Sequence, residues 1–158
     1  MPFWSGETLN EWIPRFNIID PFDTAQIDCA AYTLRMGREA YITPDYQVSI
    51  LSKHKIYRLA MDDHFVIPAG QFGFLLTEEV VSIPSHVMGF ISLRTGLKFQ
   101  GLINVSGFHV DPGCRGHLIY AVYNAGPSQI NLARGMDLFK IWIANLDRTD
   151  SHYYKAIP

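Results

Sequence analysis

From residue 30 onward, the sequence breaks into short apolar or alternating runs separated by turn residues, and this pattern constrains the fold more than any other feature. Turn signals such as Pro44-Asp45 and Pro68-Ala69-Gly70 recur between the runs. Many short strands at regular spacing predict an all-β sandwich or barrel. We expect strands at Ala31–Met36, Tyr46–Leu51, Ile56–Leu59, Phe65–Ile67, Phe72–Leu76, Glu79–Ile83, Val87–Leu93, Gly101–Val105, Gly107–Val110, His117–Tyr123, Gln129–Leu132 and Asp137–Ile143.

The N-terminal segment has a helical pattern instead. The sequence from Thr8 to Glu11 matches a capping box, and Leu9, Ile13 and neighbouring apolar residues recur at helical spacing. Pro14 interrupts this pattern and predicts an early end. We therefore expect a short helix near residues 7–13 in one domain spanning 1–158, with a helix-and-loop lead-in at 1–28 and a polar tail at 147–158.

Composition narrows the class of partner. Only 18% of the residues are charged, 48% are hydrophobic and the net charge is −2, so the chain is expected to fold and lacks the basic surface typical of nucleic-acid binding. Cys29 and Cys114 form no metal-ligand spacing, which predicts reduced thiols and no structural zinc. Neither a leader-like N-terminus nor an apolar run of about 20 residues is evident. We expect a cytoplasmic protein with no membrane partner.

The segment from Arg94 to Gly116 carries the candidate chemistry. It opens on Arg94, Thr95 and Gly96, where a glycine without Cβ lets backbone N–H groups approach an anion closely. It ends on Asp111 in an Asp-Pro-Gly turn, and an apolar run with a turn candidate lies between. We interpret this as an anion-binding loop joined by a β-hairpin to a buried carboxylate. On spacing alone, a single Asp that enters a Pro-Gly turn is usually a turn-forming residue.

Four segments in order resemble a known family. They are Ala31–Gly37, Ile67–Pro84, Arg94–Leu102 and the run from His109 through Asn124 to Met136. Together they resemble the dCTP deaminase/dUTPase superfamily. The resemblance implies a distorted jelly roll or β-barrel of the dUTPase-like (β-clip) type with a short N-terminal helix. It also implies a homotrimer whose shared sites bind a pyrimidine deoxyribonucleoside triphosphate, with Mg²⁺ held by the phosphates and not directly by the protein.

The resemblance also implies roles for individual residues. Asp111 would activate a water molecule or meet the deoxyribose 3′-OH. The phosphates would contact Arg94, Thr95, Gly96 and Lys140. The base and sugar would be read by a hairpin that contains Val105, Ser106, Gly107, His109 and Val110.

The departures from the deaminase pattern bear directly on activity. Deaminases of this family use a glutamate as proton shuttle on the strand after the Asp-Pro-Gly turn, and that position is Ala121 here. A methyl group cannot act as a general acid or base. Their helper arginine falls at Phe99, and their serine at Thr95, which keeps a hydroxyl.

The hydrolytic branch fits in part. Its water-activating aspartate corresponds to Asp111, which is present. The aspartate of its first motif corresponds to Thr33 here. Asp28, five residues earlier, could substitute for that aspartate only if the strand shifts. Its fourth-motif glutamine becomes Lys140, and the Gly-rich C-terminal arm is absent.

Three functions therefore stay open. The first is a Mg-dependent pyrophosphatase acting on dUTP or a related pyrimidine dNTP, with Asp111 as general base. The second is a non-catalytic nucleotide-binding regulator or structural homologue. The third is a dCTP deaminase with atypical residues, which Ala121 opposes.

Overall fold

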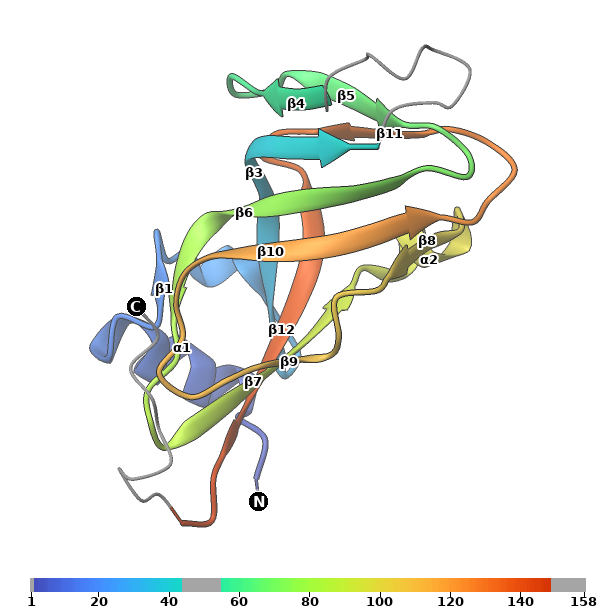
Figure 1. The fold of residues 1–158 in the computed structure, drawn as a ribbon. Coiled ribbons are helices and arrows are strands. Elements are labelled where there is room, and N and C mark those ends of the chain that lie inside the picture. The colour runs from blue at the N-terminus through green and yellow to red at the C-terminus, as the bar shows by residue number, and fades with distance from the viewer. Residues whose placement is uncertain (1, 44–54, 149–158) are drawn as a thin grey trace.

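The computed structural model describes residues 2–43 and 55–148, and most of them form antiparallel strands (Figure 1). The predicted strand Tyr46–Leu51 and most of the predicted tail lie outside these ranges. The elements are α1 (Gly6–Arg15), β1 (Ile19–Asp20), η1 (Thr24–Gln26), β2 (Ile27–Asp28), β3 (Ala31–Ile42), β4 (Lys55–Arg58), β5 (His64–Ile67), β6 (Phe72–Ser82), β7 (Val87–Leu93), α2 (Thr95–Phe99), β8 (Leu102–Asn104), β9 (His109–Val110), β10 (Arg115–Asn124), β11 (Ile130–Ala133) and β12 (Asp137–Asn145).

One curled sheet organises the described residues. Its main path runs β8-β10-β6-β3-β12-β7-β9, with β1, β2 and β4 attached to it, while β11 and β5 form a separate pair. In Figure 1, β6 and β10 cross the view at a steep angle to β12 and β7. The sheet thus forms a half-barrel, and the predicted all-β fold of distorted jelly-roll or barrel type with a short N-terminal helix is confirmed.

The curl is produced where β3 changes partners. Its first half pairs with β12 and its second half with β6, with a register shift between Met36 and Ala40. Gly37 lies at this shift, and a Cβ there would be 2.5 Å from the carbonyl oxygen of Thr77. Only a residue without a side chain permits such a close approach of two backbones.

Buried polar groups stabilise the same bend. Glu79 has no exposed surface, and its carboxylate accepts hydrogen bonds from the backbone N–H and Nε of Arg35 at 2.9 and 2.8 Å. Burial raises the pKa of Glu79, while these bonds act in the opposite direction. Thr77 Oγ1 donates to the Glu79 carbonyl and accepts from the Leu118 N–H. Every one of these side chains is therefore satisfied inside the fold.

This bend explains one wrong prediction. The segments Phe72–Leu76 and Glu79–Ile83 were expected to be separate strands, but β6 runs continuously from Phe72 to Ser82. The polar residues Thr77 and Glu78 fall between the two expected strands. In the structure they mark irregular pairing, where β10 shifts register between His117 and Ile119.

The core fills the inside of the half-barrel. The ring of Tyr120 on β10 stacks on Phe139 of β12 with centroids 3.9 Å apart, so side chains from the two halves of the sheet meet. On β10, Leu118, Tyr120 and Val122 are buried whereas Ile119 and Tyr123 are exposed, as alternation along a strand predicts. Ala121, on the same face as Ile119 and Tyr123, departs from this pattern because it is buried.

Helix α1 covers one end of this core and is longer than expected. It begins after Ser5, whose Oγ accepts from the Thr8 N–H at 3.3 Å, so Ser5 and not Thr8 is the cap. Pro14 lies in the last turn, where its missing N–H interrupts little of the helix. Leu9 and Ile13 are fully buried. None of the helices in the described part of the chain is long and apolar enough to cross a membrane.

Candidate functional site

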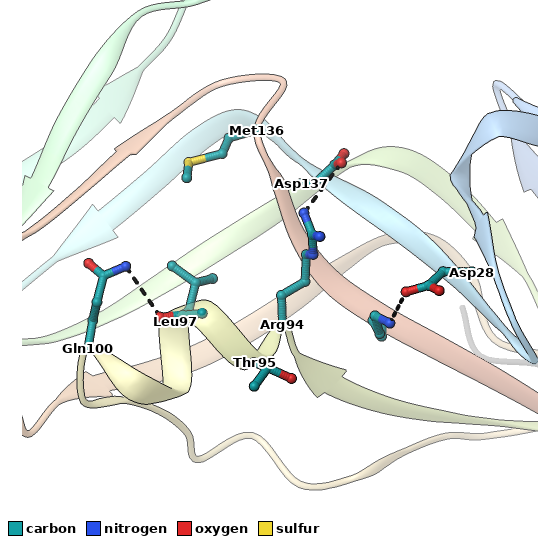
Figure 2. A pocket seen from close by; sticks show the side chains of 9 residues that line it. Asp28, Arg94, Thr95, Leu97, Gln100, Met136 and Asp137 are labelled. Atoms are coloured by element: carbon teal, nitrogen blue, oxygen red, sulfur yellow. Dashed lines mark hydrogen bonds and ion pairs between the residues drawn. The ribbon is translucent and has the colours of Figure 1, made fainter.

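A charged pocket lies at the end of β7, where the chain turns into α2 (Figure 2). Its volume is about 410 Å³. Four residues that sequence analysis assigned to phosphate binding, Arg94, Thr95, Gly96 and Lys140, all line it. The remaining lining residues are Asp28, Leu97, Gln100, Met136 and Asp137. We call this cavity the charged pocket.

Strand pairing brings its parts together. The end of β7 pairs with the start of β12, with Leu93 opposite Phe139, and the Arg94 N–H donates to the Leu138 carbonyl at 2.9 Å. Lys140 pairs with Ser92 on one side and with Thr33 on the other. Arg94 and Phe139 are 45 positions apart in the sequence, and the register of the sheet brings them together. The side chains of Arg94 and Lys140 therefore reach one cavity.

Gly96 contributes open space to the pocket. A Cβ built on this residue would meet nothing within 4 Å. Folding of the chain therefore does not demand a glycine here, and Gly96 is an exposed residue in the lining of the cavity. The expected irregular loop is instead the short helix α2, with Arg94 at its N-cap position and the Leu97 N–H bonded to the Arg94 carbonyl.

Each cation of the charged pocket already has an acidic partner. Arg94 Nη1 lies 3.5 Å from Asp137 Oδ2, and the other oxygen of Asp137 accepts from Gln26 Nε2 at 2.8 Å. Lys140 Nζ forms an ion pair with Asp28 across β3. The hydrogen bond from Lys140 lowers the pKa of Asp28, so this carboxylate stays ionised at neutral pH.

A second cavity, of about 610 Å³, lies between β7 and β8. Val105 and Gly107 line it, together with Ser92, Lys98 and Phe108. None of the residues that line it carries a carboxylate.

The structure corrects the predicted hairpin beside this cavity. β8 pairs with β10, and β9 pairs with β7, so the two strands do not pair with each other. The link between them is closed by Asn104, whose side chain accepts from the Ser106 N–H and donates to the Gly107 carbonyl at 2.8 Å. Ser106, His109 and Val110 line neither this cavity nor the charged pocket. The segment connects the two ends of the curled sheet.

Asp111 is not buried as expected. Its side chain is 63% exposed, and its Oδ1 lies 3.5 Å from His109 Nε2. Its carbonyl accepts from the Cys114 N–H at 3.1 Å, which closes the Asp-Pro-Gly turn. It lines neither cavity.

The distance between Asp111 and the charged pocket follows from the register. Val110 lies opposite Gly89 near the start of β7, whereas Arg94 follows the end of that strand. At about 3.3 Å per residue, the strand separates the two positions by roughly 16 Å. The described residues of one chain thus do not bring Asp111 and Arg94 into one cavity.

The two positions that depart from the deaminase pattern lie in different surroundings. Ala121 is buried on β10, opposite Phe74, and its carbonyl accepts from the Val105 N–H at 2.8 Å. Phe99 ends α2 with 87% of its surface exposed. Within the described ranges, the carboxylates that line either cavity are Asp28 and Asp137.

The donor set of the charged pocket fits a metal that arrives with its ligand. Carboxylate oxygens suit Mg²⁺. However, both carboxylates here are paired with cations, and the described residues contain no cluster of three or more His, Cys, Asp or Glu side chains that could hold a metal ion. Any Mg²⁺ would need further oxygens from the ligand. Cys29 and Cys114 are free thiols.

Comparison with known proteins first defines the class of fold. The chain resembles the crystal structure of 2′-deoxycytidine 5′-triphosphate deaminase from Agrobacterium tumefaciens, with a TM-score of 0.71 and 14% sequence identity. The match covers 89% of this chain and 47% of that chain. At this identity the likeness shows that the two share a fold.

Sequence comparison then gives the family. The family model described as dCTP deaminase-like matches residues 3–146. The chain is 30% identical to the dCTP deaminase of Pyrococcus furiosus over 149 residues, which covers 94% of this chain and 88% of the relative. It is 27% identical to the dUMP-forming dCTP deaminase of a Hydrogenobaculum species, over 93% of this chain and 84% of the relative. The chain therefore belongs to the dCTP deaminase-like family.

Proposed function

We propose that this protein binds a pyrimidine deoxyribonucleoside triphosphate and that its charged pocket receives the triphosphate. The observation that carries the proposal is the convergence of Arg94 and Lys140 on one open cavity beside Gly96. A cation at the N-cap of α2 and another on β12 suit an extended polyanion, because arginine and lysine both bind phosphate through charge-assisted hydrogen bonds. The names of the relatives, which are dCTP deaminases, support a pyrimidine nucleotide.

Mg²⁺ enters this proposal as a companion of the nucleotide. When bound, it would neutralise part of the phosphate charge. Asp28 and Asp137 are the residues of this chain that would face it, while Arg94 and Lys140 would face phosphate oxygens.

Hydrolysis of the triphosphate is the second candidate function, and the accessible carboxylate of Asp111 favours it. Asp111 and the charged pocket lie at opposite ends of β7 in one chain, so a site that uses both requires two copies of the protein. A homotrimer with shared sites satisfies this requirement. In such an assembly, Asp111 of one copy would activate water against the nucleotide held by Arg94 of another.

Deamination is the activity that the names of the relatives suggest and that the residues of this chain oppose. A buried methyl group stands at Ala121, and the cavity beside β8 has no carboxylate lining it. A general acid or base is needed to move protons at the pyrimidine ring. We therefore expect no ammonia from dCTP.

One screen tests all three candidates. The purified protein is incubated with each dNTP and Mg²⁺, and pyrophosphate, ammonia and melting temperature are measured. Binding predicts a higher melting temperature with dUTP or dCTP, as ligand linkage requires. No shift with any pyrimidine dNTP at millimolar concentration would contradict the proposed function. Pyrophosphate release supports hydrolysis, and ammonia release would overturn the expectation based on Ala121.

A further inference from the structure

The charged pocket is electrically balanced by its own side chains. Arg94 and Lys140 supply two positive charges, and Asp137 and Asp28 supply two negative ones. A free polyphosphate entering this cavity meets no net attraction from these four groups. It must also displace two carboxylates from the cations that are to bind it.

The carboxylates are held so that they compete effectively. Asp137 is fixed from behind by Gln26, which leaves its Oδ2 directed at Arg94 (Figure 2). Asp28 bonds directly to Lys140. Neither pair is deeply buried, because Arg94 and Asp137 are 46% and 39% exposed and Asp28 is 53% exposed. Ion pairs at this exposure are worth about 0–1 kcal/mol each, so a ligand can exchange them.

A metal complex of a polyphosphate can replace both partners of each pair at once. Its phosphate oxygens can take the place of the carboxylates at Arg94 and Lys140. Its divalent cation can then take the place of those cations beside Asp28 and Asp137. Every charge keeps a partner in this exchange, whereas a free polyphosphate would leave two carboxylates without partners next to its own negative charge.

We propose that Asp137 and Asp28 are specificity-determining residues, which make the charged pocket select the divalent-metal complex of a triphosphate over the free anion. This inference rests on the proposed function for the location of the ligand and goes beyond it in assigning the selection to two carboxylates. We call these four side chains the charge-exchange set. Each carboxylate competes with phosphate for its cation until a metal ion binds beside the carboxylate and leaves the cation to the phosphate.

The test uses inorganic triphosphate as the probe, so that base recognition plays no part. Calorimetric binding is measured at constant ionic strength in EDTA and in Mg²⁺. Wild-type protein is expected to bind the Mg²⁺ complex at least tenfold more tightly than the free anion. Asp137→Asn and Asp28→Asn should each tighten binding of the free anion about two- to fivefold. Asn at 137 keeps an oxygen for Gln26, so folding is preserved.

Two controls separate local competition from a general change in charge. Asp147→Asn removes one negative charge outside the pocket, from a carboxylate that accepts from the Arg148 N–H, and should leave the affinity unchanged. In the Arg94→Gln background, Asp137→Asn should no longer tighten binding, because the cation it competes for is gone. A gain that persists in that background overturns the proposal.

Failure of this inference is distinguishable from failure of the proposed function. Equal wild-type affinity for free and Mg²⁺-bound triphosphate overturns the charge-exchange set even if dNTPs bind. The charge-exchange set is also overturned if Asp137→Asn leaves the affinity for the free anion unchanged. If dNTPs fail to bind wild-type protein but Asp137→Asn binds free triphosphate, the proposed function fails and the competition is supported.

Discussion

The two ends of β7 differ in what they offer a ligand. At the C-terminal end, Arg94 joins Lys140, Asp28 and Asp137 in a cavity of about 410 Å³. At the other end, Asp111 stands exposed beside His109 on a tight turn and lines no described cavity. One end has the charges needed to hold an anion, and the other has a carboxylate accessible to water and to other molecules.

This difference teaches that neither end is a complete site. The charged pocket has cations that can bind an anion, but neither of its carboxylates is free to act as a general base, because each is paired with a cation. Asp111 is accessible to water but has little to hold an anion, since His109 is the one basic side chain within ion-pair distance of it among residues 2–43 and 55–148. A general base must lie within hydrogen-bond reach of the water it activates. The two ends become one active site only if two chains place them together.

The largest expected effect is on hydrolysis. Asp111→Asn should lower the rate of pyrophosphate release from dUTP by roughly 10²–10⁴ if Asp111 is a general base. The affinity for the nucleotide should stay within about twofold, because the binding end of β7 is unchanged. Steady-state kinetics and calorimetry measure the two quantities separately. An unchanged rate would reduce Asp111 to a turn residue.

A complementation experiment tests whether the two ends of β7 from different chains form one site. Arg94→Gln and Asp111→Asn proteins are each expected to be inactive, whereas co-expressed chains should regain part of the activity in assemblies that pair an intact Arg94 with an intact Asp111. If hydrolysis occurs and no mixture recovers it, the two ends of β7 do not serve a shared site.

Loss of the cation at the binding end is the next largest effect. Arg94→Gln should weaken binding of the Mg²⁺–dNTP complex about 10–100-fold, because a charge-assisted hydrogen bond contributes about 1.5–3 kcal/mol. Arg115→Gln is the matched control, since Arg115 is an exposed arginine at the start of β10 and lines neither cavity. Equal effects of the two substitutions would mean that overall charge, and not the charged pocket, attracts the nucleotide.

Two glycines offer a smaller and more local test. Gly96→Ala adds a methyl group in the open space of the charged pocket, so affinity should fall about tenfold (~1.4 kcal/mol) without loss of stability. Gly37→Ala would bring Cβ to 2.5 Å from the Thr77 carbonyl oxygen and should destabilise the fold by roughly 1–3 kcal/mol. Chemical denaturation and calorimetry distinguish these outcomes. A destabilised Gly96→Ala protein would indicate a structural glycine.

The fold was largely predictable because strand periodicity is a local signal. β7 has the predicted bounds, Val87–Leu93, and most other described strands differ from prediction by one to three residues. The exceptions are β1 and β2, where no strand was expected, and β3 and β6, which are longer than expected and pair side by side near Gly37 and Thr77. Whether two polar residues end a strand or mark a bulge depends on the strand that lies beside them, and the sequence of one strand does not contain this information.

The phosphate-binding assignments included four residues that line the charged pocket, but neither of its carboxylates. Arg94 and Lys140 were assigned from the resemblance, but their partners were not. Asp137 was missed although it begins a predicted strand, and Asp28 was thought to need a strand shift. The structure places Asp28 beside Lys140 without one, because β2 and β12 pair with opposite edges of β3. A polar residue at the start of an apolar strand was the available signal for Asp137.

The smallest expected effect concerns the pH dependence of stability. The pKa of Asp28 in the folded state is lowered by Lys140, and that of Glu78 is lowered by Arg134, which donates to it at 3.0 and 2.8 Å. A lowered folded-state pKa means that each pair contributes stability above the ordinary pKa of the acid, near 4. This contribution is lost as the pH falls through the lowered value.

The two pairs should differ in size because they differ in exposure. Asp28 is half-exposed, so Asp28→Asn should cost less than about 1 kcal/mol at pH 7. Glu78 and Arg134 are only 20% and 22% exposed, and Glu78→Gln should cost about 1–3 kcal/mol. Both variants should converge on wild-type stability toward pH 3 in denaturation measurements. If Asp28→Asn instead proves as costly as Glu78→Gln, the ion pairs of the charged pocket are structural and are not free to exchange with a ligand.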